Sequence, residues 1–182
     1  KDQIDFMLNK DIGYDKDNVI VIGNGRALGQ QVESFKTELK KRADIRNAAS
    51  SNDYPATAKH YFSINRAGGA GEGFVTLYNT GGDIDFIETL GMEIVLGRSY
   101  FDTDSAKTII NESAVRALGF EDPIGKELGR HGTTIVGVVK DFHYMSMHRD
   151  IRPFILWKNP NNAGANHISV RISPENIPET IE

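Results

Sequence analysis

The segment Thr133–Val139 constrains the fold strongly, because it reads TTIVGVV and is apolar over nearly its whole length. A strand with one hydrated face alternates apolar and polar side chains, and this segment does not. A nearly continuous apolar run is typical of a strand that is buried on both faces. We therefore expect Thr133–Val139 to be a central strand of a sheet.

Other strands and helices alternate irregularly along the chain. Strands are expected at residues 19–22, 45–51, 60–65, 74–80, 92–98, 107–110, 153–157 and 168–173. Helices are expected at residues 28–39, with a basic end that reads KTELKKR, at 83–91 behind an Asp83 cap, and at 111–119 behind an Asn111 cap. Gly91 and Gly119 would end the last two. This pattern favours an α+β fold over a doubly wound parallel sheet.

Composition excludes several classes of function. The chain has 182 residues, no cysteine and a net charge of −4. Disulfides and thiolate zinc sites are therefore excluded, and nucleic acid is not expected as a partner because it requires a basic face. No apolar run reaches the ~18 residues that would indicate a membrane-spanning helix.

Both ends of the chain coincide with expected helices. Ile4, Met7, Leu8 and Ile12 recur at helical spacing, and Ser173 is placed to cap a second helix that begins at Pro174. We therefore expect the chain to be an excised domain of a longer protein.

The stretch VIGNGRALG outlines a dinucleotide-binding turn through Gly23, Gly25 and Gly29. The next expected strand, IRNAASS, contains few β-branched residues, and Asp53 is only roughly placed to bind a ribose. A glycine triplet alone is weak support for a nucleotide site. A flexible connection between strand and helix is the favoured interpretation, and a soluble nucleotide-binding protein or enzyme is the alternative.

The segment VVKDFHYMSMHRD contains an Asp141–His143 pair that would face one side of an extended strand. Such a pair can ligate a metal or orient a base, but no third ligand is evident, since His131 and His167 lie on separate loops. Hydrogen bonding to nearby backbone at a strand end is the favoured interpretation. No metal site is predicted.

No other polar cluster predicts an active site. The serines lack a nucleophile turn such as G-x-S-x-G, and helix starts and turns explain Glu112 and Glu121. Arg98 suits either an anion or a tie between loops. Tyr144, Met145 and Met147 fit either an exposed interaction surface or the core. No chemical role is assigned to the other polar candidates, which are Ser105, Ser113, Ser146, His148 and Asp150.

Four ordered segments carry a family resemblance: the LGR turn, the INESAVRALG helix, the DPIGK turn and the GVVKDFH strand. Together they resemble the extracytoplasmic domain of MacB-type and FtsX-like ABC transporter permeases, in the version common in Bacteroidetes. The match extends over nearly the whole chain and is thinnest at RAGGAGEG.

The resemblance implies two lobes and an extension of a transmembrane helix. A porter-like β-α-β layered lobe would comprise residues 14–80 and 150–182, and an inserted sabre-like α+β lobe residues 81–149. Residues 1–13 would extend the first transmembrane helix. The motif residues would have structural roles rather than catalytic ones: Gly97, Arg98, Asn111, Glu112, Asp122, Pro123, Gly125, Lys126, Gly137, Asp141, Phe142, His143 and Pro153.

The resemblance also implies a non-catalytic function on the periplasmic side of the bacterial inner membrane. The domain would transmit ATP-driven motion of the transmembrane helices to cargo or partners outside, in export, lipoprotein extraction or signalling. It would need no cofactor, because a separate cytoplasmic ATPase would use the ATP. Implied partners are the transmembrane helices, that ATPase, a second permease copy, and a periplasmic adaptor or lipoprotein.

Overall fold

The computed structural model describes residues 12–55, 57, 60–65, 73–128, 132–145, 150–159 and 165–174. The helix expected at residues 1–12 and the RAGGAGEG loop lie almost wholly outside this part of the chain. The described strands form one ten-stranded sheet in the order β1-β10-β2-β4-β9-β6-β8-β5, with β3 added on β4 and β7 on β8. This sheet with few helices confirms the α+β expectation.

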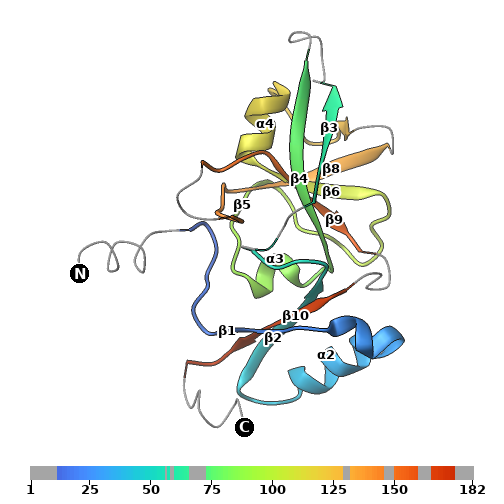
Figure 1. The fold of residues 1–182 in the computed structure, drawn as a ribbon, viewed down its shortest axis with the longest axis vertical. Coiled ribbons are helices and arrows are strands. Elements are labelled where there is room, and N and C mark those ends of the chain that lie inside the picture. The colour runs from blue at the N-terminus through green and yellow to red at the C-terminus, as the bar shows by residue number, and fades with distance from the viewer. Residues whose placement is uncertain are drawn as a thin grey trace, which may run out of the picture.

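One end of the sheet, which we call the base, combines the start and the end of the described chain (Figure 1). It consists of β1 (Val19–Ile22), η1 (Gly25–Gln31), α2 (Val32–Lys40), β2 (Ile45–Ser51) and β10 (His167–Ile172). β10 lies between β1 and β2 and is antiparallel to both. Val32, Ile168 and Val170 are among the residues that form a hydrophobic core between the sheet and the helices.

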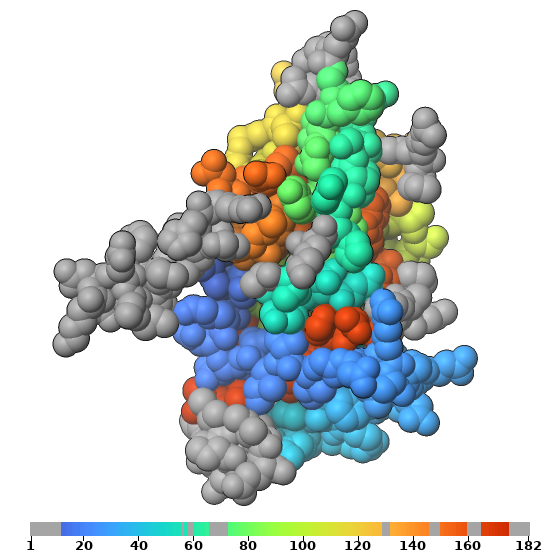
Figure 2. Space-filling model, in the orientation of Figure 1, coloured from blue at the N-terminus to red at the C-terminus, as the bar shows by residue number. Residues whose placement is uncertain are grey.

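The remaining elements form the head, which lies above the base in Figures 1 and 2. They are β3 (His60–Asn65), β4 (Phe74–Gly82), α3 (Phe86–Thr89), β5 (Ile94–Gly97), β6 (Lys107–Asn111), α4 (Glu112–Leu118), β7 (Glu127–Leu128), β8 (Thr133–Val139) and β9 (Phe154–Lys158). β8 lies between β6 and β5 and is buried along most of its length, as its apolar run predicts.

Two hydrophobic cores fill the head. Under α4, Ala114 and Leu118 pack with residues such as Leu77 and Ile135. Under α3, Phe86 and Leu90 pack with an aromatic group that includes Phe142. β9 pairs with β4 on one side and with β6 on the other. Strand pairing therefore continues from the expected porter-like lobe, which contains β9, into the expected sabre-like lobe, which contains β6. The division at residues 81 and 149 stays a prediction.

Two local expectations gain a long-range part. Asp83 Oδ1 accepts from Asp85 N at 3.1 Å, which is the expected cap of the turn that leads into α3, while Asp83 Oδ2 is bonded to Lys36 and Ser50. Lys36 lies in the expected basic end of α2, but its side chain is only 2% exposed. Both residues face the boundary between base and head, and their pairing is described below.

Candidate functional site

Asn111 ties three elements of the head together at the start of α4. Its side-chain oxygen accepts hydrogen bonds from Ala114 N at 3.0 Å, which is the expected N-cap, and from Phe154 N at 2.8 Å. Its amide nitrogen donates to Arg152 O at 3.0 Å. Gly119 closes the helix with a φ of 75°, as its position predicts.

The INESAVRALG and GVVKDFH motifs meet at Asp141. The carboxylate accepts from Ser113 N and Ser113 Oγ, both at 2.8 Å, and from Arg116 at 2.5 Å. In return, Asp141 N donates to Glu112 Oε2 at 3.0 Å. This reciprocal pattern fastens the N-terminus of α4 to the end of β8. The bond from Ser113 N agrees with the backbone role favoured for Asp141.

The other motif residues occupy turns that flank β8. Arg98 forms a bidentate ion pair with Asp104, with N–O distances of 2.6 and 2.9 Å, and its guanidinium lies over the Phe101 ring. This hydrogen-bonded partner lowers the pKa of Asp104 to about 2. Gly125 N donates to Ile135 O at 2.9 Å, so the DPIGK turn is fixed to β8. All partners described for the Arg98 side chain lie in its own loop, residues 98–106 between β5 and β6, so Arg98 braces one loop rather than joining two and is not an open anion site.

Within the same turn, Lys126 N donates to Pro123 O, Pro123 is buried, and Asp122 is exposed. Pro153 O accepts from Tyr78 N at 2.9 Å where β9 approaches β4.

The chain that leads into β1 is attached to the head. His143 N donates to Ile12 O at 2.8 Å, and Ile12 is buried. Gly13 has a φ of +80°, and a Cβ there would lie 2.3 Å from Asp141 O. The segment expected to continue a transmembrane helix therefore contacts the GVVKDFH motif through its backbone.

The glycine turn does not have the geometry of a phosphate site. Gly25 is buried, and its N–H donates to Asn166 O at 2.8 Å instead of facing an open site. The turn opens a 3-10 helix with a kink at Gly29, and β1 is an edge strand antiparallel to its neighbour. A dinucleotide turn needs free amides at a helix N-terminus next to a parallel strand.

The other candidate residues do not converge on a reaction centre. Within the described ranges, no group of three or more His, Asp or Glu residues is placed to hold a metal. Ser113 Oγ donates to a carboxylate already shared with Arg116, and Glu121 and Asp150 are exposed. His167 packs edge-on against Tyr54. His131, Ser146, Met147 and His148 lie outside the described residues.

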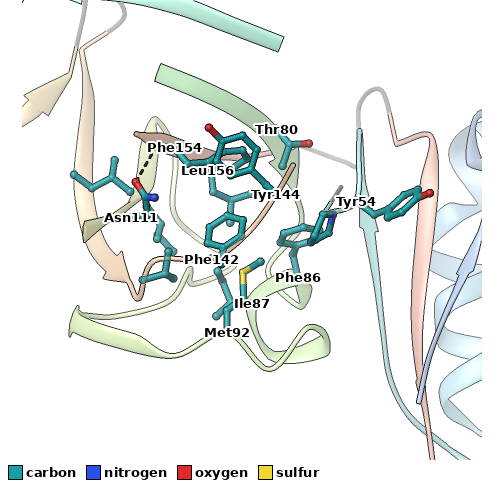
Figure 3. A pocket seen from close by; sticks show the side chains of 14 residues that line it. Tyr54, Thr80, Phe86, Ile87, Met92, Asn111, Phe142, Tyr144, Phe154 and Leu156 are labelled. Carbon is teal, nitrogen blue, oxygen red and sulfur yellow. Dashed lines mark hydrogen bonds between the residues drawn. The ribbon is translucent and has the colours of Figure 1, made fainter. Parts of the chain in front are cut away.

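An apolar cavity lies under α3, lined by residues such as Phe86, Phe142 and Tyr144 (Figure 3). Its volume of about 10 Å³ is only enough for a single water-sized body, and its walls are almost wholly apolar. It is a packing gap in the head core rather than a ligand site. A wider, open cleft of about 530 Å³ lies between α2 and the 102–106 loop.

Comparison with known structures relates the fold to transporter domains. The periplasmic region of MacB from Actinobacillus actinomycetemcomitans aligns with 90% of this chain and 77% of its own, at 18% identity and a TM-score of 0.57. The extracellular domain of the noncanonic ABC-type transporter YknZ from Gram-positive bacteria aligns with 90% of this chain and 88% of its own, at 18% identity and a TM-score of 0.56. The chain has the MacB-type extracytoplasmic fold.

A third structure has the same MacB-type fold. It is a domain from Porphyromonas gingivalis assigned to a permease protein, and it aligns with 79% of this chain and 70% of its own, at 18% identity and a TM-score of 0.52. Comparisons of the sequence with protein-family models and with curated proteins find no match. Among the described residues, no helix is both long and apolar enough to cross a bilayer.

Proposed function

We propose that this chain is a non-catalytic extracytoplasmic domain of an ABC transporter permease. It would lie on the periplasmic side of the inner membrane and transmit the motion of transmembrane helices to cargo or partner proteins. Export, lipoprotein extraction and signalling all fit this role. A cytoplasmic ATPase would supply the energy, so this chain would need no cofactor of its own.

The observation that carries the proposal is the MacB-type fold shared over 90% of the chain with two transporter domains. The attachment of the entering segment supports it independently. Ile12 and Gly13 contact residues 141–143, just after β8, through backbone atoms, so a displacement of this segment would be passed to the head. Packed cores move as rigid bodies rather than deform, which makes such a transfer efficient.

The partners proposed for the chain follow from this role. They are the transmembrane helices of the same permease, its cytoplasmic ATPase, a second permease copy, and an adaptor or lipoprotein in the periplasm. The net charge of −4 gives no basis for a nucleic-acid partner.

The first experiment is to determine the sequence on both sides of the chain in its gene product. Apolar spans of about 20 residues should precede residue 1 and follow residue 182. The second is to purify that gene product from membranes and test whether an ATPase subunit co-purifies. Flanks without such spans would refute the proposal, and a membrane protein without a bound ATPase would refute the transporter part of it.

A further inference from the structure

The head rests on the base through a contact that we call the joint. In it, α3 lies against one face of β2 and β10. Ala49 of β2 belongs to the same hydrophobic core as Phe86 and Leu90, which places this face of the strands toward α3. Within the described part of the chain, the sheet register joins base and head at one pair, Ser51 with Gly82, which is flanked by backbone hydrogen bonds from Asn52 N to Gly81 O and from Asp83 N to Ser50 O.

The joint contains buried hydroxyl groups that make no hydrogen bond. Ser51, Thr89 and Ser169 are each 0% exposed, and none of their hydroxyls has a partner among the described residues. Ser169 is the cross-strand partner of Ala49, and Ser51 lies two residues beyond Ala49, so both face α3. Closing the joint therefore removes three hydroxyls from water without replacing their hydrogen bonds, which is unfavourable.

One side of the joint is firmly held, and we call this contact the pin. Asp83 Oδ2 accepts from Lys36 Nζ at 2.5 Å, from Ser50 N at 2.7 Å and from Ser50 Oγ at 2.9 Å. Burial raises the pKa of Asp83, and the Lys36 ammonium opposes that rise. Breaking the pin would leave a buried charge without its partners, so this side should stay closed.

The other side is held by the segment that enters the base, and we call this contact the clasp. Asp15 N donates to Leu90 O at 2.9 Å, and Arg171 Nε donates to Thr89 O at 2.7 Å. The side chains of Asp15 and Arg171 form an ion pair at 2.6 Å, with Asp15 51% exposed. The clasp is therefore more accessible to water and salt than the pin, and it belongs to the same segment as Ile12.

We propose that the joint opens by rotation about the pin, and that release of the clasp controls this opening. The hydroxyls of Ser51, Thr89 and Ser169 gain hydrogen bonds to water in the open state, so opening costs less than separation of a fully satisfied interface. A pull on the segment at residues 12–15 would release the clasp first. The idea that a pull on this segment opens the joint rests on the proposed function. Opening of the joint is a property of the isolated chain, so the joint proposal and the proposed function can fail separately.

Single cysteines test the opening directly, because the sequence contains no cysteine of its own. Ser169→Cys places one thiol in the joint, and Ala48→Cys and Ala114→Cys place matched thiols in the base and head cores, where both alanines are 0% exposed. Reaction with an aromatic disulfide reagent is followed in native buffer. The joint thiol should react at least roughly tenfold faster than either core thiol, because local opening is cheaper than unfolding.

Two further comparisons isolate the clasp and the hydroxyls in the Ser169→Cys background. Asp15→Asn should speed the reaction roughly threefold by breaking an ion pair, while Asp17→Asn should leave it unchanged. Thr89→Val should slow it at least about fivefold, because the closed joint no longer buries that hydroxyl. If Ser169→Cys does not fold, Ser51→Cys reports on the same face of the joint.

Equal rates at positions 48, 114 and 169, all tracking global unfolding in denaturant, would overturn the proposal. So would a reaction that Asp15→Asn and Asp17→Asn alter equally, since the clasp would then have no specific role. Neither result would bear on whether membrane spans flank the chain.

Discussion

Gly97 and Gly137 are cross-strand partners in β5 and β8, and neither position has room for a side chain. A Cβ at Gly97 would lie 2.4 Å from Val136 O, and one at Gly137 would lie 2.2 Å from Arg98 O. The short backbone approach lets Arg98 N donate to Val136 O at 3.0 Å. These two motif glycines therefore allow β5 to pack onto β8.

Substitution of the motif glycines should separate backbone strain from steric clash. Gly97 and Gly125 both have positive φ, at 74° and 82°, but only Gly97 faces backbone atoms within contact distance. Gly125→Ala should cost about 1–2 kcal/mol of unfolding free energy. Gly97→Ala should cost about 2 kcal/mol more, because of overpacking. Urea denaturation measures both, and equal losses would show that β5 adjusts to the added methyl group.

Removal of the Asp141 carboxylate should loosen α4 from β8. Asp141→Ala leaves the amide of Ser113 and the guanidinium of Arg116 without their acceptor. We expect a loss of about 1–3 kcal/mol. Asp150→Ala, at an exposed position, is the control and should change stability by less than about 0.5 kcal/mol. The two variants are compared by thermal and chemical denaturation, and similar losses would contradict the role given to Asp141.

Two buried tyrosines should respond differently to loss of the hydroxyl. Tyr100 Oη donates to Leu156 O at 2.5 Å, whereas Tyr144 Oη has no partner among the described residues. Tyr100→Phe should cost about 1 kcal/mol, since the Thr108 hydroxyl still donates to the same carbonyl. Tyr144→Phe should be neutral or stabilising by up to about 1 kcal/mol. A destabilised Tyr144→Phe variant would reveal a hydrogen bond that the described residues do not include.

The Arg98–Asp104 pair should make the free energy of unfolding depend on pH in the acidic range. The pKa of Asp104 is lowered to about 2 in the folded chain, below its ordinary value of 3.8. Its contribution is therefore present above about pH 4 and is lost as the pH falls through about 2. Asp104→Asn should reduce stability at pH 7 by about 1–2 kcal/mol, allowing for solvent around Arg98.

The difference between the wild-type chain and Asp104→Asn should shrink steadily from pH 4 to pH 2 in denaturation measured at each pH. A difference that stays constant over this range would mean that Asp104 titrates normally.

Local sequence signals predicted the local structure. Asn111 and Gly119 mark the start and the end of α4 as capping rules require, and the apolar run of β8 predicted its burial. The hairpin of β3 and β4 also lies where it was expected. Each of these signals depends on residues close together in the chain, so a single sequence is enough to show them.

Long-range pairs were not predictable in the same way. Lys36 and Asp83 are 47 positions apart, and each was assigned a local role, as part of a basic helix end and as a cap. No periodicity marks a lysine that will be buried against a carboxylate from another element. The contact between Ile12 and His143 also required knowledge of the sheet order.

The place of β10 in the sheet determines when the base can form during synthesis. β10 is the last described strand in the chain but lies between β1 and β2, which are made first. The head strands, residues 60–158, are complete before β10 leaves the ribosome, and domains generally fold as their sequence emerges. A nascent chain that stops before His167 would therefore contain every described strand of the head. Its base strands β1 and β2 would lack the strand that lies between them, and such unpaired edges are prone to association with other chains.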